Sequence, residues 1–160
     1  MSYGRTGARQ GSPPPEHGMV ITFSLLPSPM TSNRPKDPAI RVAMMPSDTN
    51  VHGTIFGGVI LSHIDQAGAI AARAYTRERV VTVAIKEVEF HKPVYVGDIV
   101  SYYAWVTALG TTSITVKVEV MAERYRPYGR KVEVTAAELV YVSVDDHFEK
   151  IPVSKEPITA

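Results

Sequence analysis

A glycine-rich turn that leads directly into an apolar helix is the most informative segment of this chain. Residues 50–58 read NVHGTIFGG, and the apolar run Val59-Ile60-Leu61 follows at once. Glycine lets a backbone approach a ligand closely, and a helix start offers unpaired N–H groups at the positive end of its dipole. The segment therefore suits a polarised carbonyl group or a developing oxyanion, with the Gly58 N–H as the candidate donor.

Asp65 is the candidate acid–base group, because it is the single carboxylate two turns into the predicted helix. On a helical wheel it falls near Leu61 and Ala72, at the edge of the apolar stripe. A solvated helix acid would fit this spacing equally well. A carboxylate aimed into a cleft would act as a general base on water, which contributes about 10²- to 10⁴-fold in rate.

Asn50 and the glycine pair each have a structural and a functional interpretation. Asn50 either caps the backbone of its turn, as Asn commonly does, or orients water or substrate. Gly57 and Gly58 either permit tight packing or form an oxyanion hole, in which one donor is worth roughly 3 to 4 kcal/mol. The residue types alone leave both interpretations open.

Histidine and cysteine chemistry is not favoured. His52, His63 and His91 lack companions at a metal-ligand spacing such as His-Glu-x-x-His, so ordinary structural roles are expected, although His91 lies at a strand end where it would line a cleft. Ser62 is not part of a nucleophile-elbow motif. The chain has no cysteine, which removes disulfides and thiolate sites. We expect no metal and no resident cofactor.

Two further turns carry polar groups. Gly110-Thr111-Thr112-Ser113 has the composition of a hairpin turn rich in hydroxyls, and the next turn contains Arg124, Arg126, Arg130 and Lys131. A charge cluster of this kind is usually a solvated turn. Guanidinium groups also suit phosphates, because they form paired, charge-assisted hydrogen bonds.

Length and composition indicate one soluble globular domain. The 160 residues are enough for a core, and apolar residues make up 44% and charged residues 21% of them. A net charge of +1 favours neither nucleic acid nor a membrane surface, and no apolar run approaches the ~20 residues of a membrane span. The lack of cysteine is compatible with a reducing cytoplasm, the expected location.

The chain divides into three parts by composition. Residues 1–38 contain seven of the prolines and are expected to form a disordered or loosely docked arm. Residues 39–153 form the folded domain, and 154–160 a tail. Periodicity predicts a helix from Gly57 to about Tyr75 and strands at Ala39–Met45, Val80–Phe90, Ile99–Thr107, Ser113–Met121 and Lys131–Val144.

These elements predict an α+β fold with an antiparallel sheet around one helix. The short connections predict that successive strands pair, and a change of alternation predicts a bulge near Lys86-Glu87. Gly68 inside the helix implies a close neighbour, such as a sheet that wraps tightly around it. The exposed edges of the sheet are of a kind that pairs across a dimer.

An ordered series of residues resembles the hotdog-fold acyl-CoA thioesterases, most closely the small bacterial hydrolases related to YciA. The resemblance spans roughly residues 39–152, and its matches are Met45-Pro46, Asp48, Asn50, Gly53, Phe56-Gly57-Gly58, Leu61-Ser62, Asp65, Gly68-Ala69, Val80-Val81-Thr82-Val83, Pro93-Val94, Val96-Gly97-Asp98, Gly110-Thr111-Thr112-Ser113 and Tyr141-Val142-Ser143-Val144-Asp145.

The resemblance implies a hotdog fold and hydrolysis of acyl-CoA to free acid and coenzyme A. It assigns Asp65 as general base or nucleophile, and pairs it with Asn50 of the opposite subunit. It implies a homodimer assembled into a tetramer or a hexamer, the latter a trimer of dimers. Contacts with substrate or coenzyme A are implied for Phe56, Gly57, His91, Gly110, Thr111, Thr112, Ser113, Arg124 and Arg126.

Two other functions remain open on the sequence. A non-catalytic acyl-CoA sensor would use the same fold but would not need a carboxylate aimed at the thioester, so Asp65 discriminates against it. A hotdog dehydratase would need a His and an acid in the cleft, and the sequence has no recognisable dehydratase motif.

Overall fold

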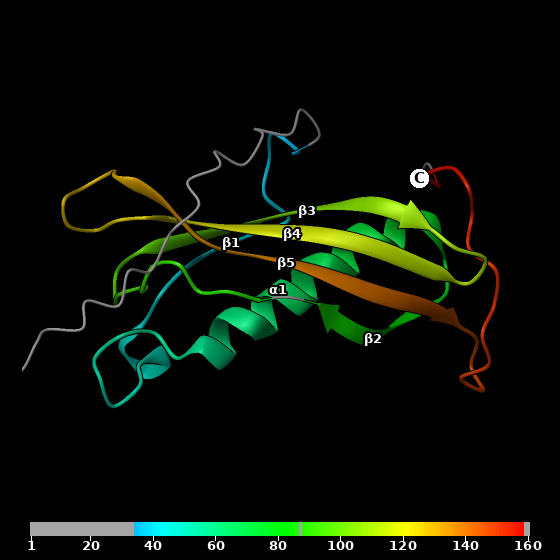
Figure 1. Ribbon diagram of the computed structural model, residues 1–160, viewed down its shortest axis with the longest axis horizontal. Helices are drawn as coiled ribbons and strands as arrows, with labels where there is room; N and C mark the ends of the chain where they lie inside the picture. Colours follow the sequence, from blue (N-terminus) through cyan, green and yellow to red (C-terminus); the bar gives the residue numbers. More distant parts are fainter. Residues whose placement is uncertain (1–33, 87, 159–160) are drawn as a thin grey trace, which may run out of the picture. The chain divides into compact units, whose positions relative to one another are not determined.

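The computed structural model describes residues 34–86 and 88–158, which form one curled sheet and one long helix (Figure 1). The elements in chain order are β1 (Ile40–Ala43), a 3₁₀ turn (Pro46–Asp48), α1 (Gly57–Ala72), a second 3₁₀ turn (Arg73–Tyr75), β2 (Arg79–Lys86), β3 (Ile99–Leu109), β4 (Ser113–Glu123) and β5 (Lys131–Val144). The predicted arm at residues 1–33 lies outside the described residues.

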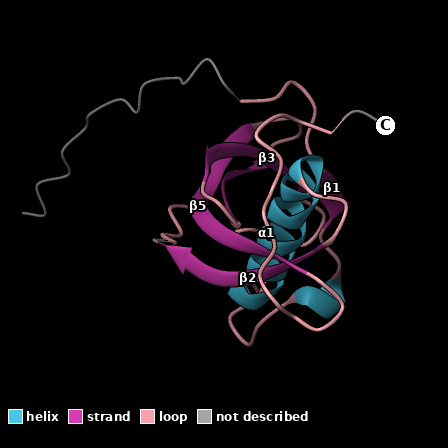
Figure 2. Ribbon diagram, turned by 90° about the vertical axis from the view of Figure 1, so that its right-hand side faces the viewer, coloured by secondary structure: helices cyan, strands magenta, loops and turns pink. Residues whose placement is uncertain are grey.

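The five strands form one antiparallel sheet in the order β1-β3-β4-β5-β2. This sheet curves around α1, which Figure 2 shows inside the curl. One helix enclosed by an antiparallel sheet is the α+β hotdog architecture that the sequence predicts.

The core lies between α1 and the concave face of the sheet. Strand β4 alternates strictly between buried and half-buried residues, as period-two side-chain geometry requires. The helix contributes Ile60, Ile64 and Ala67, all fully or almost fully buried. The predicted apolar stripe of the helix is therefore the stripe that packs on the sheet.

Gly68 is the closest contact between helix and sheet. A Cβ atom at this position would collide with the Tyr141 hydroxyl and come within 3.0 Å of two carbons of its ring. Gly costs about 1 kcal/mol relative to Ala inside a helix, and the position of Tyr141 explains its presence here. The close neighbour predicted from the sequence is confirmed.

The predicted pairing of β2 with β3 is wrong. Strand β2 pairs with β5 instead, at the opposite side of the sheet from β1, while β3–β4 and β4–β5 are neighbours as predicted. The connection from β2 to β3 is long enough to join strands that are not neighbours, so connection length alone does not decide which strands pair.

The predicted bulge is also misplaced. The register of β2 against β5 shifts between Thr82 and Ala84, and the strand ends at Lys86 rather than Phe90. Glu87 lies outside the described residues. Val83 is the unpaired residue of the shift and is 55% exposed, so the alternation Val81-Val83-Ile85 does not mark one buried face.

The ends of the domain are fixed by backbone hydrogen bonds. In the tail, the N–H of Ser154 donates to the carbonyl of Tyr75 at 2.9 Å, and the N–H of Ile158 donates to the carbonyl of Ala74 at 2.7 Å.

Within residues 34–86 and 88–158, no helix has the length and apolar character needed to cross a membrane.

Candidate active site

Asp65 lies where α1 meets the edge strand β2. The Thr82 hydroxyl donates to Asp65 Oδ1 at 2.6 Å. The Tyr141 hydroxyl donates to the backbone carbonyl of Asp65 at 2.8 Å and approaches Oδ1 at 3.3 Å. The carboxylate is half-buried and is held by residues of two different strands, unlike a solvated helix acid.

Tyr141 is a fully buried residue of β5 that the sequence did not mark as functional. Burial, followed by the negative charge of Asp65, raises the pKa of the Tyr141 hydroxyl well above its usual value of about 10. The hydroxyl is therefore protonated at neutral pH and remains a hydrogen-bond donor. Gly68 was the signal in the sequence that a large side chain must approach the helix at this level.

Asn50 closes the loop that precedes the helix. Its Oδ1 accepts from the N–H groups of His52 at 2.9 Å and Thr54 at 3.3 Å, and its Nδ2 donates to the Thr54 hydroxyl at 2.9 Å. Gly53 has φ +78° in the same turn, a conformation that favours glycine. These contacts fit the structural interpretation of Asn50, and one of its two Nδ2 protons is left for a ligand.

The helix starts with its backbone N–H groups uncapped by a side chain. Phe56, in extended conformation, is the residue before α1 and makes no side-chain cap hydrogen bond. Phe56 is 58% exposed, and its ring covers Gly58, where a Cβ would collide with it. Gly58 thus lies in the first turn of α1 beneath the Phe56 ring.

A hollow of about 310 Å³ opens beside this helix start. It brings Gly57 together with His91 and also includes Phe90, whose ring lies 3.6 Å from an ideal Cβ at Gly57. The remaining lining residues are Thr54, Ile55, Ile60, Lys92, Pro93 and Val94. The hollow is mainly apolar, with Thr54, His91 and Lys92 as its polar or charged side chains.

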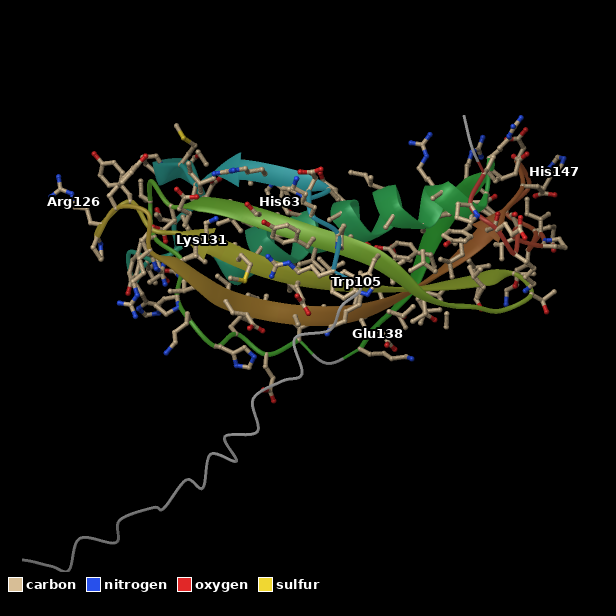
Figure 3. The ribbon with its side chains drawn as sticks, turned by 90° about the horizontal axis from the view of Figure 1, so that it is seen from above. His63, Trp105, Arg126, Lys131, Glu138 and His147 are labelled. Carbon is tan, nitrogen blue, oxygen red and sulfur yellow. The ribbon has the colours of Figure 1, made fainter. Side chains whose placement is uncertain are left out.

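The Gly110–Ser113 turn and the arginine turn lie at opposite ends of β4. Strand β4 has 11 residues, so its ends are separated by roughly 35 Å at about 3.3 Å per residue. Figure 3 shows Arg126 at one end of the sheet and His147, which follows β5, at the other; the N–H of Ser143 near that end donates to Thr112. One chain does not bring the two predicted coenzyme-binding turns together.

Arg124 is paired inside the protein. Its guanidinium group forms an ion pair with Asp98, and the two side chains are 10% and 2% exposed. Asp98 also accepts from the N–H groups of Tyr95 at 3.0 Å and Tyr125 at 3.1 Å. This geometry fastens the arginine turn to residues 95–98. Arg126 is exposed and lies 5.6 Å from the centre of the Tyr125 ring.

The helix histidine has a structural environment. His63 Nδ1 lies 2.9 Å from the Val59 carbonyl, to which it donates in the Nδ1–H form, and its ring stacks on Tyr102 at 5.4 Å. Within the part of the chain that the structure describes, no three His, Asp or Glu side chains gather at a metal-binding distance. Independence of metals stays a prediction.

Comparisons with known proteins agree with this architecture. The family model described as the thioesterase superfamily matches residues 52–126. The acyl-CoA thioester hydrolase YciA of Escherichia coli K12 is 42% identical over 118 residues, which are 72% of this chain and 89% of that protein. A related Buchnera aphidicola protein, described as an uncharacterized acyl-CoA thioester hydrolase, is 47% identical over 109 residues, 67% of this chain and 81% of its own.

Solved structures of similar fold have the same character. A hexameric hotdog fold thioesterase of Campylobacter jejuni superposes with a TM-score of 0.71 at 49% identity, covering 74% of this chain and 91% of the other. An acyl-CoA hydrolase of Staphylococcus aureus, solved with butyryl coenzyme A and coenzyme A, gives a TM-score of 0.66 at 32% identity, with 72% and 70% covered.

Proposed function

The chain belongs to the thioesterase superfamily, among its acyl-CoA thioester hydrolases, and we propose that it hydrolyses acyl-CoA to a free carboxylic acid and coenzyme A. The observation that carries the proposal is the Asp65 carboxylate, held by Thr82 and Tyr141 at the open edge of the sheet. A sensor that only binds acyl-CoA has no use for such a carboxylate.

The proposed reaction needs only groups of the protein and water. Asp65 takes a proton from a water molecule, whose oxygen forms a bond to the thioester carbon. The carbonyl oxygen becomes an oxyanion and accepts from the Gly58 N–H, a contribution of roughly 3 kcal/mol to transition-state stability. The C–S bond then breaks, and the coenzyme A thiolate leaves with the proton that Asp65 accepted, which restores the carboxylate.

The alternative role of Asp65 as nucleophile leads to a different isotope pattern. Hydrolysis by a general base places one solvent oxygen in the acid at every turnover. An Asp65 nucleophile first forms a mixed anhydride, and water that attacks the Asp65 carbonyl leaves a carboxylate oxygen of the enzyme in the acid. A single turnover in ¹⁸O water that leaves the acid unlabelled would therefore show an Asp65 nucleophile with water attack on the Asp65 carbonyl.

The spacing along α1 is compatible with a site built from two chains. Gly58 and Asp65 are seven residues apart, which is about 10 Å along a helix at 1.5 Å per residue. A thioester carbonyl that accepts from the Gly58 N–H is then not in direct contact with the Asp65 carboxylate of the same helix, and the family resemblance pairs Asp65 with Asn50 of the opposite subunit. We propose that Asn50 and Gly58 of one protomer act with Asp65 of its partner.

The edge strand β2 gives a route to this arrangement. In the described part of the chain β2 pairs only with β5, so its outer backbone groups are available to a second copy. A two-fold axis near the middle of β2 makes the two helices run in opposite directions. Each helix start then approaches the middle of the other helix, where Asp65 lies beside Thr82.

Larger assembly and coenzyme contacts belong to the same proposal. The Campylobacter jejuni relative is described as hexameric, and we extend this to a trimer of dimers for this chain, in the cytoplasm.

We propose that the coenzyme phosphates bind at exposed Arg126 and at the Gly110–Ser113 turn, each from a different protomer. Arg124 fits a structural role better because Asp98 already neutralises its charge.

A panel of acyl-CoA substrates of increasing chain length tests the function. Release of coenzyme A is followed with a thiol reagent for the wild type and for Asp65→Asn, with and without EDTA. The proposal expects turnover by the wild type, little by the variant and no effect of the chelator. Binding of acyl-CoA without release of thiol would favour the sensor.

A further inference from the structure

The hydroxyl of Tyr141 makes a contact with the helix that few helices permit. Tyr141 lies on β5, 76 residues from Asp65 in the sequence, and its hydroxyl reaches both the backbone carbonyl and the carboxylate of that one residue. A helical carbonyl oxygen already accepts a hydrogen bond from an N–H of the next turn. The Tyr141 hydroxyl therefore donates to the second lone pair of the Asp65 carbonyl oxygen. This bond anchors the hydroxyl at a fixed level of α1.

Gly68 is the residue that makes the contact possible. It lies three positions after Asp65 and therefore on a neighbouring part of the helix surface. A Cβ there would overlap the Tyr141 hydroxyl and crowd two ring carbons. The small residue and the large one are complementary, and together they bring a donor to Asp65.

The two donors meet the same carboxylate oxygen. Thr82 and Tyr141 both approach Oδ1, at 2.6 and 3.3 Å, and no other residue in the described part of the chain donates to the Asp65 side chain. Oδ2 is therefore the oxygen that is left to meet water. Tyr141 is the titratable group in contact with this carboxylate.

We infer that Tyr141 is a positioning residue for the Asp65 carboxylate and that Gly68 serves to admit its hydroxyl. The inference rests on the proposed role of Asp65 in thioester hydrolysis. The hydroxyl and Thr82 hold the carboxylate by Oδ1, with Oδ2 toward the open edge of the sheet.

Tyr102 supplies a matched control. It is also a fully buried tyrosine facing the helix, but its hydroxyl has no hydrogen-bond partner among the described residues. Both side chains lose a single oxygen when replaced by phenylalanine. Only the Tyr141 substitution removes a hydrogen bond, so the pair separates positioning of Asp65 from a general effect on the core.

The test compares Tyr141→Phe, Tyr102→Phe, Gly68→Ala and Asp65→Asn, using the acyl-CoA of the panel that the wild type hydrolyses fastest. We expect Tyr141→Phe to lower kcat about 10- to 100-fold, the range for a hydrogen bond to a charged group, with KM nearly unchanged. Tyr102→Phe keeps the wild-type kcat and KM.

Gly68→Ala gives a second route if Tyr141→Phe does not fold, because it displaces the hydroxyl while retaining the phenol. It should show the same split between kcat and KM. A folded Tyr141→Phe or Gly68→Ala with the kcat of the wild type would overturn the inference while Asp65→Asn is inactive. An active Asp65→Asn would instead overturn the proposed role of the carboxylate itself.

Discussion

The two halves of the candidate site are held in different ways. Asp65 is fixed by Thr82, 17 residues away, and by Tyr141, 76 residues away. Asn50 is fixed within residues 50–54 by its own turn. The carboxylate thus depends on the assembled sheet, whereas the loop depends on local hydrogen bonds.

The largest expected effect comes from the half that depends on the sheet. Asp65→Asn retains an oxygen that Thr82 and Tyr141 can contact but cannot take a proton from water. We expect kcat to fall by about 10²- to 10⁴-fold, with a melting temperature close to that of the wild type. Asp146→Asn, an exposed carboxylate paired with Arg79, is the control and should retain activity.

The local half is tested by Asn50→Asp. The substitution keeps the oxygen that accepts from His52 and Thr54, but replaces the Nδ2 donor. If Asn50 orients substrate or water, kcat falls by roughly 10²-fold, comparable to the loss of one donor to a developing charge, and stability changes little. Full activity would show that Asn50 serves the turn alone.

Arg124 and Arg126 are neighbours in sequence but differ in environment. Arg124→Met leaves Asp98 buried without a counter-charge, so we expect a loss of about 3 to 5 kcal/mol in the free energy of unfolding, measured by denaturant titration. A loss below about 1 kcal/mol would contradict the structural role that the buried ion pair indicates.

Arg126 should have the smallest effect. Its exposed guanidinium group is a candidate for a coenzyme phosphate, so Arg126→Ala is expected to raise KM several-fold at low salt with no change in stability. The difference should shrink as ionic strength rises, because exposed charges are screened within about 10 Å at 0.1 M. An unchanged KM at low salt would place the phosphates elsewhere.

Much of the fold follows from local pattern. The bounds of β5 agree with the prediction, because β-branched residues recur along it and a charged turn with Pro127 and Gly129 precedes it. The start of α1 at Gly57 also agrees. The pairing of β2 with β5 does not follow from local pattern. It depends on how the sheet closes around the helix, and the length of the connection from β2 to β3 carries no information on that.

The candidate site is partly readable from the sequence for the same reason. The glycine turn and Asp65 are visible as residue types at a helix start. Tyr141 was missed because nothing near position 141 indicates that its hydroxyl reaches a helix 76 residues earlier. Arg124 was grouped with a solvated turn because a cluster of charged residues in the sequence does not show which side chains are buried. Its partner Asp98 belongs to a different turn of the chain.

Mixing two inactive variants is the most direct test of a site shared between chains. Asn50→Asp and Asp65→Asn are each purified, unfolded together in equal amounts, and refolded. With random pairing, each site takes one residue from each of two chains, so about one quarter of sites are intact. Recovery of about one quarter of wild-type activity is expected, whereas either variant refolded alone stays at its own low residual activity. Verified mixed assemblies that remain as inactive as their parents would contradict the shared site.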